Sequence, residues 1–267
     1  MRNMRTFKPV IEYSTIKDIK LIPCKLAPLD TDEIIIYTIY LPDFIELKSD
    51  LSQFLTSKEL KKAQRFFKEI DRSRFIIYRS ILKFVLAAHT KLNVKNIYLD
   101  YQFNKKPYLA SHPWLFFNLS HSEDFAAIAV SRKNVGLDIE YMSKDFNFTS
   151  LLPDVFDDNQ VLQIQNAADK KHAFYTSWTR KEAFVKALGK GIDEDFKQIP
   201  SLDGQHKIDF SLIKNSKNWQ VNSFNLADSY LGAVAFENLS AISRNLVFYI
   251  IPNKIDKLLE MAQIKNN

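Results

Sequence analysis

The sequence predicts an α+β protein built from two similar α/β halves. Two long segments, residues 71–89 and 170–188, show a helical spacing of apolar residues or consist of good helix formers. Short runs of β-branched and aromatic residues surround them, the clearest being residues 34–40, IIIYTIY, which Pro42 ends. Each half therefore contains a long helix and several strands, although no repeat is visible in the letters themselves.

The other elements are predicted along the whole chain. A further helix is expected near residues 157–167, and strands are expected at residues 96–101, 115–120, 125–131, 135–141, 207–213, 219–224, 230–236 and 245–251. The polar segment 131–134 separates two strand runs, so we assign residues 34–133 to the first half and residues 134–267 to the second. Residues 1–33 show no periodicity and are interpreted as an N-terminal extension.

Composition limits the kind of partner more than the kind of reaction. The formal net charge of +6 favours nucleic acid, anionic membranes, phosphorylated metabolites or acidic proteins, without choosing among them. Cys24 is the only cysteine, which excludes an intramolecular disulfide and fits a reducing compartment. No apolar stretch reaches the roughly 20 residues that span a bilayer, and no signal peptide is recognisable. We expect a cytoplasmic protein that does not bind membranes.

The first unusual pattern is VGLDIEY, residues 135–141. Alternation along a strand places Gly136, Asp138 and Glu140 on one face. Two carboxylates so placed repel each other unless a cation or basic groups lie between them. The pattern fits either a solvated sheet edge or a site for a hard cation such as Mg²⁺, which prefers carboxylate oxygens and retains waters and phosphates as ligands.

The second pattern is WTRKEAFVKALGKG, residues 178–191. Glycines end the predicted helix after Leu188, and Trp178, Glu182 and Lys186 share one face because they lie four residues apart. A solvated glutamate–lysine pair explains this spacing. A third carboxylate beside a lysine is also what a metal–pyrophosphate site requires, because lysine neutralises phosphate charge as the bond breaks.

Two segments of the first half are candidates for binding an anion. FFNLSHS, residues 116–122, ends an apolar strand, so Ser120 and His121 either cap a turn or donate hydrogen bonds to a phosphate. A serine–histidine hydrolase is a poor alternative because the G-x-S-x-G pattern is absent. NKKPYL, residues 104–109, places two lysines before a proline, and most of the arginines and lysines of residues 61–79 are expected to be surface charges.

In this order, NKKPYL, FFNLSHS, VGLDIE and WTRKEAFVKALGKG resemble the motifs of the 4′-phosphopantetheinyl transferases. The similarity is to the larger, pseudodimeric class typified by the surfactin-synthetase activator, and it covers roughly residues 34–240. Enzymes of that family transfer phosphopantetheine from coenzyme A to a serine of an apo acyl or peptidyl carrier protein and release 3′,5′-ADP. The resemblance implies a monomer of two similar halves with the active site in the cleft between them.

The resemblance also implies roles for individual residues. Asp138, Glu140 and Glu182 match ligands of Mg²⁺, which Mn²⁺ is able to replace, and Lys186 matches a residue that contacts the pyrophosphate. Asp138, Glu182 and Lys186 are therefore the expected catalytic residues. The remaining positions expected to bind coenzyme A are Lys62, Lys106, Ser120 and His121, to which we add Arg74.

The implied reaction begins with loss of a proton from the carrier serine, whose oxygen then attacks the β-phosphorus of coenzyme A. The base is either Glu182 or a metal-bound water, and the sequence does not separate them. Two residues depart from the family pattern: Lys105 stands where a glycine is usual, and Gln160 stands near a position where many members carry a glutamate. Neither is one of the three expected metal ligands.

Two other functions remain open at this point. A nucleic-acid-binding protein would interleave basic clusters with exposed aromatics, whereas most aromatics here lie in apolar periodic segments. A catalytically inactive relative would bind coenzyme A or a carrier protein without transfer, but the retained carboxylates and Lys186 argue against it. We therefore expect an acidic carrier protein as partner, and neither nucleic acid nor a membrane.

Overall fold

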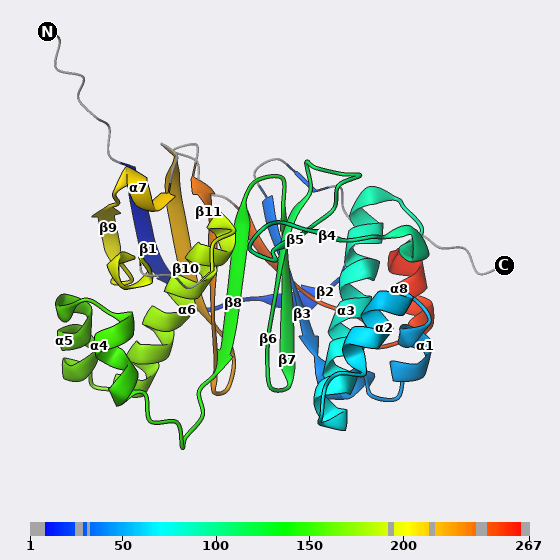
Figure 1. Ribbon diagram of the computed structural model, residues 1–267, viewed down its shortest axis with the longest axis horizontal. Coiled ribbons are helices and arrows are strands. Elements are labelled where there is room, and N and C mark those ends of the chain that lie inside the picture. The colour runs from blue at the N-terminus through cyan, green and yellow to red at the C-terminus, as the bar shows by residue number, and fades with distance from the viewer. Residues whose placement is uncertain are drawn as a thin grey trace, which may run out of the picture. The chain divides into compact units, whose positions relative to one another are not determined.

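The computed structural model of the chain divides into two compact units (Figure 1). Unit 1 comprises residues 1–19 and 133–243, and unit 2 comprises residues 20–132 and 244–267. The residues whose structure is described are 9–24, 29–30, 33–191, 195–213, 217–238 and 245–262. The chain thus begins in unit 1, forms most of unit 2, returns to complete unit 1 and ends in unit 2.

Unit 2 contains a five-stranded sheet with the strand order β2-β12-β3-β7-β6. Its strands are β2 (Leu21–Pro23), β3 (Glu33–Tyr40), β6 (Phe116–Ser122), β7 (Phe125–Ser131) and β12 (Asn245–Ile250). Strand β12 pairs in parallel with both of its neighbours, whereas β3, β7 and β6 pair antiparallel. A separate two-stranded ribbon joins β4 (Asp100–Tyr101) to β5 (Pro107–Tyr108).

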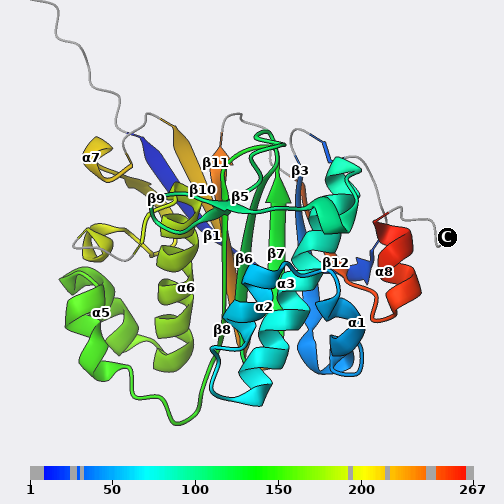
Figure 2. The ribbon, with the colours of Figure 1, turned by 45° about the vertical axis from the view of Figure 1, so that its right-hand side comes forward.

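The long helix of unit 2 is α3 (Glu69–Thr90), which shares a hydrophobic core with the sheet. Acidic residues in its first turn complement the helix dipole, and Lys91, with a φ of 61°, ends it. The shorter helices near it in Figure 2 are α1 (Lys48–Ser52), α2 (Ser57–Ala63) and α8 (Ile255–Met261), with 3₁₀ turns η1 (Leu41–Phe44) and η2 (Val94–Asn96).

Unit 1 is built on a five-stranded sheet with the strand order β8-β11-β10-β1-β9. Its strands are β1 (Val10–Ile16), β8 (Val135–Tyr141), β9 (Gly204–Lys207), β10 (Asn218–Ala227) and β11 (Tyr230–Asn238). Helix α6 (Lys170–Leu188) packs on β8, β11 and β10. The remaining elements are η3 (Thr149–Leu151), α4 (Leu152–Val155), α5 (Asp158–Asn166), η4 (Phe196–Gln198) and α7 (Phe210–Ile213).

The two units share one arrangement of strands around their long helices. In unit 2 the chain runs β3, α3, β6, β7, and in unit 1 it runs β8, α6, β10, β11. In both, the last strand lies between the other two and is antiparallel to each. The prediction of an α+β protein with two similar halves is therefore confirmed, and the likeness lies in topology rather than in the letters.

The ends of the chain differ from the predicted domain plan. Residues 10–16 of the supposed extension form β1, which pairs in parallel with β10 and antiparallel with β9. Ile11 and Tyr13 of this strand are buried in the core of unit 1, so the segment completes a sheet. At the other end, β12 and α8 belong to unit 2, because β12 hydrogen-bonds to β3. One crossing between the units falls after Arg132.

Two predicted strands are wrong in whole or in part. Most of residues 207–213 forms helix α7, because the Asp209 side chain accepts a hydrogen bond from the Ser211 backbone N–H and starts a helical turn. Most of residues 96–101 is not a strand, because Asn93 caps the 3₁₀ turn η2 in the same way. No helix in the described parts of the chain is both long enough and apolar enough to cross a membrane.

Candidate active site

Helix α6 and strand β8 approach each other closely at Gly136. A Cβ atom at this position would lie 2.0 Å from the backbone oxygen of Ala183 and 2.2 Å from the backbone nitrogen of Ala187. Only a glycine admits such an approach. Because side chains alternate along β8, Asp138 and Glu140 face the same helix as Gly136. The strand's two carboxylates are thus directed toward α6.

Asp138 is not a solvated carboxylate at a sheet edge, since only 3% of its side chain is exposed. The ammonium of Lys186 donates a hydrogen bond of 2.5 Å to its Oδ1 atom. Burial lowers the pKa of Lys186, but the carboxylates of Asp138, Glu182 and Glu140 outweigh this and leave the pKa raised. Lys186 therefore stays charged and is electrostatically coupled to all three predicted metal ligands.

Glu182 is shifted toward its neutral form. Burial raises its pKa most, Lys186 lowers it, and Asp138 and Glu140 raise it again, to about 7. The Oε1 atom of Glu182 is buried and has no hydrogen-bond partner among the residues that the structure describes. Three carboxylates and one ammonium thus form a partly buried cluster with an excess of negative charge.

This cluster fits a divalent cation by its chemistry. Within the described ranges, no group of three or more His, Cys, Asp or Glu side chains is already arranged to hold a metal ion. However, the three side chains offer only oxygen donors, which hard cations prefer. A cation would also offset the repulsion that raises the pKa of Glu182, and it would give the buried Oε1 atom a partner.

A cavity of about 500 Å³ lies beside Glu140 in unit 1. Its walls are mainly aromatic and apolar, and its lining residues are Glu140, Ser143, Asp145, Phe146, Leu151, Phe174, Tyr175 and Trp178. Trp178 lies one helical turn before Glu182, so the cavity and the carboxylate cluster are neighbours along one face of α6. The cavity is suited to an apolar chain that belongs to the same ligand as a metal-bound phosphate.

The loop after β8 forms one wall of this cavity and is fixed to α6. The ammonium of Lys171 donates hydrogen bonds to the backbone oxygens of Ser143, at 2.8 Å, and Lys144. Further along the loop, the ring of Phe146 lies 6.2 Å from that of Phe174. Sequence reasoning missed this wall, because the only available signal was the four-residue spacing of Phe174 and Trp178.

In unit 2, two of the predicted coenzyme A residues contact the same turn of α3. The Lys62 ammonium lies 5.4 Å from the centroid of the Phe75 ring. The His121 ring stacks on Tyr78, with centroids 4.4 Å apart and an interplanar angle of 17°. Ser120 is buried, and its side chain points to the opposite face of the sheet because strand residues alternate. The structure therefore brings Lys62 and His121, but not the Ser120 side chain, to this face of α3.

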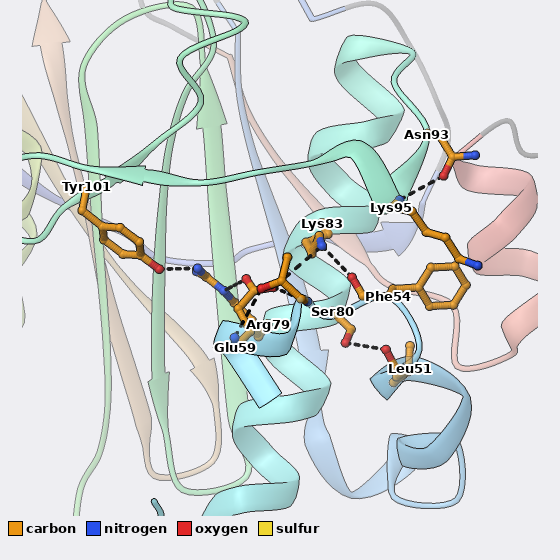
Figure 3. A network of polar contacts seen from close by, with 10 residues as sticks. Leu51, Phe54, Glu59, Arg79, Ser80, Lys83, Asn93, Lys95 and Tyr101 are labelled. Atoms are coloured by element: carbon orange, nitrogen blue, oxygen red, sulfur yellow. Dashed lines mark hydrogen bonds and ion pairs between the residues drawn. The ribbon is translucent and has the colours of Figure 1, made fainter. Parts of the chain in front are cut away.

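Arg79 also lies on α3, and it is buried rather than one of the expected surface charges. Its Nε atom donates to Glu59 Oε1 at 2.7 Å, and its Nη2 atom donates to the Tyr101 hydroxyl (Figure 3). Lys83 lies 3.8 Å from the same glutamate. The network joins α2, α3 and β4. Burial and the charge of Arg79 lower the pKa of Lys62.

Arg74 makes contacts that suit a structural role better than the predicted contact with coenzyme A. Its Nη2 atom lies 3.0 Å from a carboxylate oxygen of Glu123 and 2.8 Å from one of Asp124. Its Nη1 atom lies 3.5 Å from Asp71 on the same helix. Three carboxylates already surround this guanidinium, so an anionic ligand would compete with them.

The segment around Lys106 keeps a conformation that glycine favours. Lys105 has a φ of 62°, in the left-handed region, and its backbone N–H donates to the Gln102 oxygen at 2.9 Å. The lysine at this position therefore does not abolish the turn that a glycine would form. Lys106 itself is half-buried, and burial lowers its pKa to about 8.

Gln160, the second departure from the family pattern, has a structural contact. It is buried in α5, and its side-chain amide donates to the backbone oxygen of Ile199 at 3.0 Å. Its own backbone N–H donates to the Asp157 side chain at the start of the helix. Gln160 thus ties α5 to the segment that follows η4.

Taken together, the fold and these groups define a class of enzyme. The carboxylate cluster with its lysine suits a divalent cation and a pyrophosphate, and the adjoining cavity suits an apolar chain. The basic and aromatic groups of unit 2 suit the nucleotide part of a ligand. These features suit an enzyme that acts on a large phosphate-bearing substrate.

Comparison with known proteins identifies the family. The model of the 4′-phosphopantetheinyl transferase superfamily matches residues 134–235, and the N-terminal 4′-phosphopantetheinyl transferase model matches residues 45–133. The transferase HetI of Nostoc sp. is 33% identical over 168 residues, which is 61% of this chain and 71% of HetI. The transferase psf-1 of Bacillus pumilus is 31% identical over 188 residues, 69% of this chain and 79% of its own. Sfp of Bacillus subtilis is 26% identical over 186 residues, 65% and 80% of the two chains.

The chain belongs to the 4′-phosphopantetheinyl transferase family. It is an enzyme that transfers phosphopantetheine from coenzyme A to a carrier protein. The first matched region contains α3, β6 and β7, and the second contains β8, α6, β10 and most of β11. The matches therefore cover the topology that the two units share, except for β3 of unit 2, which precedes residue 45, and the end of β11.

Proposed function

We propose that this enzyme transfers 4′-phosphopantetheine to a serine of an apo acyl or peptidyl carrier protein in a Mg²⁺-dependent reaction that releases 3′,5′-ADP. Mn²⁺ is proposed as a working substitute. The observation that carries the proposal is the electrostatic coupling of Asp138, Glu140 and Glu182 with Lys186. All four residues lie within the region that matches the transferase superfamily.

Asp138, Glu140 and Glu182 are the residues that would hold the ion. When bound, Mg²⁺ would withdraw charge from the pyrophosphate and favour cleavage of its bond. Glu182 would then be held in its ionised form, and its buried Oε1 atom would gain a partner. The closeness of α6 to β8 at Gly136 supports this set, because it brings ligands from a strand and a helix together.

The transfer moves one proton, forms one bond and breaks another. The carrier serine loses its hydroxyl proton to a base while its oxygen forms a bond to the β-phosphorus of coenzyme A. The bond from that phosphorus to the bridging oxygen breaks, and the oxygen leaves with the electron pair as part of 3′,5′-ADP. Lys186, which the cluster keeps charged, would stabilise the leaving group. The carboxylate of Glu182, held in its ionised form, is the proposed proton acceptor.

The cavity beside Glu140 is proposed to receive the pantetheine chain. Beyond the β-phosphate, that chain carries no charge. The aromatic walls formed by Phe146, Phe174 and Trp178 offer it apolar contact, and Glu140 places the opening next to the proposed metal ligands. A ligand with its pyrophosphate at the carboxylate cluster would thus have its two chemically different parts in matching surroundings.

Unit 2 is proposed to bind the nucleotide part of coenzyme A. Lys62 of α2 and His121 of β6 contact the same turn of α3. Lys106 follows a turn with a defined conformation. The two lysines suit phosphate groups, and the stacked rings of His121 and Tyr78 suit a base. Ser120 stays in the proposed set through its backbone, whereas Arg74 is the weakest member because of its three carboxylate neighbours.

The proposed partner is an acidic carrier protein. The formal net charge of +6 would favour its approach electrostatically. We further propose that the enzyme acts as a monomer in the cytoplasm, because each unit already contains its own core and the chain has a single cysteine.

Mass spectrometry of an apo carrier protein tests this function directly. Incubation with the enzyme, coenzyme A and Mg²⁺ should add the mass of one phosphopantetheine, EDTA should abolish the gain, and excess Mg²⁺ should restore it. The variant Asp138→Ala should lose turnover, while Asp154→Ala, an exposed carboxylate of the same unit, should keep it. Wild-type turnover by Asp138→Ala at saturating Mg²⁺ would refute the metal assignment, and no gain with several carriers would refute the reaction.

A further inference from the structure

Lys181 precedes Glu182 in α6, yet its side chain is fully buried and lies against backbone groups. Its ammonium donates three hydrogen bonds to backbone carbonyl oxygens, at 2.8 Å to Val155, 3.1 Å to Phe196 and 3.0 Å to Lys197. An ammonium has three N–H donors, so each of them is used. Lys181 therefore has neither the exposure nor the spare donor that a contact with phosphate would require.

The three carbonyl groups belong to two segments that are far apart in the sequence. Val155 ends α4, whereas Phe196 and Lys197 begin η4. The ammonium also lies 4.9 Å from the centroid of the Phe156 ring and 5.5 Å from that of Phe196. Burying an ammonium is costly unless its hydrogen bonds are satisfied, so this contact set favours one arrangement of α4 and η4 against α6.

This anchor lies next to both parts of the candidate active site. Successive residues of a helix are rotated by about 100°, so Lys181 faces α4 and η4 while Glu182 faces the carboxylates of β8. A shift of α6 at Lys181 would therefore also move Glu182. Leu151, which lines the cavity, directly precedes α4, so the same anchor also supports the cavity wall.

We infer that Lys181 is a positioning residue for the transfer reaction, which fixes Glu182 and the cavity wall at residues 151–155 without touching the substrate. The inference rests on the proposed role of Glu182 as a metal ligand. The motif alone favours the opposite interpretation, because a lysine beside a metal ligand in a phosphate-handling enzyme is expected to bind phosphate. The buried carbonyl contacts decide between the two.

Lys181→Met removes the three donors and keeps a flexible apolar side chain. Lys170→Met is the matched control, because Lys170 lies on the same helix but is exposed. Two quantities are compared with those of the wild type: the affinity for Mn²⁺, measured by electron paramagnetic resonance, and kcat. Both are measured well below the midpoint temperature of unfolding of each protein. Lys181→Met should lower the affinity for Mn²⁺ and kcat by roughly 10- to 100-fold each, which is the usual effect of losing groups that support metal ligands. Lys170→Met should change neither by more than about twofold.

The Lys181→Met substitution leaves three buried carbonyl oxygens without a hydrogen-bond donor, and this loss is large enough to unfold the variant. A second test therefore uses the wild-type protein. Lysines are labelled with an amine-reactive reagent, with and without coenzyme A and Mg²⁺, and each site is quantified by mass spectrometry. Lys181 should stay unlabelled in both conditions. Lys62, which is exposed and whose pKa is lowered, should be labelled in the free protein and protected by the ligands.

Two results would overturn the inference. One is wild-type Mn²⁺ affinity and kcat in a folded Lys181→Met variant. The other is labelling of Lys181 in the free protein that coenzyme A then suppresses, since this would make Lys181 a direct ligand. Failure of the wild type itself to bind Mn²⁺ or to transfer phosphopantetheine would instead refute the proposed function. The Mn²⁺ binding and transfer activity of the wild type are therefore measured before any variant is made.

Discussion

Burial and charge act in opposite directions on two neighbouring side chains of α6. The pKa of Glu182 is raised to about 7, chiefly by burial, so it resists ionisation. The pKa of Lys186, one turn later, is raised despite burial because three carboxylates favour its charged form. Such coupled shifts are typical of functional sites, whereas an exposed glutamate–lysine pair on a helix shifts little. The shifts therefore favour a functional site over a solvated glutamate–lysine pair for Glu182 and Lys186.

Lys106 provides a prediction at the residue scale. Burial lowers its pKa to about 8, so in the free enzyme it is charged below that pH and neutral above it. If it binds a phosphate of coenzyme A, the affinity should fall as the pH rises through about 8. Isothermal titration of coenzyme A between pH 7 and pH 9.5, values chosen to bracket about 8, measures this.

Lys106→Met supplies the control for that titration. Without a titrating ammonium, the variant should bind coenzyme A more weakly at low pH and should lose the fall near pH 8. A wild-type affinity that is flat across the range, or an equal fall in the variant, would remove Lys106 from the binding site.

At the scale of elements, the contact between β8 and α6 decides whether the cluster exists. Gly136→Ala would place a Cβ atom 2.0 Å from the backbone oxygen of Ala183, and backbone atoms do not rotate away as side chains do. The helix must shift, which should cost about 1–3 kcal/mol of unfolding free energy and separate Asp138 from Lys186. Urea unfolding and transfer assays should therefore both report a loss.

Gly191→Ala is the matched control for this prediction, because nothing lies within 4 Å of a Cβ atom there. It should leave stability and activity close to those of the wild type. A Gly136→Ala variant as stable and active as Gly191→Ala would show that the close approach does not matter.

Periodicity and end signals predicted some elements better than others. Strands β7 and β8 and helix α6 have the predicted bounds, because alternation and the glycine after Leu188 mark them clearly. Apolar periodicity does not predict helix α2, whose start is marked instead by the capping box that Thr56 and Glu59 form. The apolar spacing of residues 207–213 predicts a strand, but the Asp209 side chain accepts a hydrogen bond from the Ser211 backbone N–H and starts a helical turn there.

The sequence predicted some residues of the candidate site but not others. Asp138, Glu182 and Lys186 share specific motifs, and in the structure Lys186 is coupled to both carboxylates. The aromatic cavity was not foreseen, because Phe146 reaches it from a loop whose path depends on Lys171. A pattern of letters does not encode such tertiary contacts.

At the scale of the whole molecule, each unit takes a strand from a distant part of the chain. The sequence of β12 reads as a buried strand, but nothing in it specifies that its neighbour is β3 of unit 2. Likewise β1 alternates weakly and is flanked by charged residues, so its place beside β10 was not recognised. Strand pairing across two hundred residues is a tertiary property that local propensity does not report.

This exchange of ends predicts how fragments behave. A fragment of residues 134–267 lacks β1, with its buried Ile11 and Tyr13, and it carries β12 without β3. It should therefore show no cooperative unfolding. A chain in which residues 9–19 are joined by a flexible linker to residues 133–243 should unfold more cooperatively, as judged by circular dichroism in urea. Equal cooperativity of the two would contradict the assignment of the strands.

The central claim is that Asp138, Glu140 and Glu182 bind one divalent cation. The most direct measurement is the binding of Mn²⁺ to the purified enzyme, followed by electron paramagnetic resonance. A single saturable site is expected in the wild type, with an affinity for Mn²⁺ that is weakened roughly 10-fold or more in folded Asp138→Asn and Glu182→Gln variants. Wild-type Mn²⁺ affinity in both variants, or no saturable binding by the wild type with coenzyme A present, would contradict it.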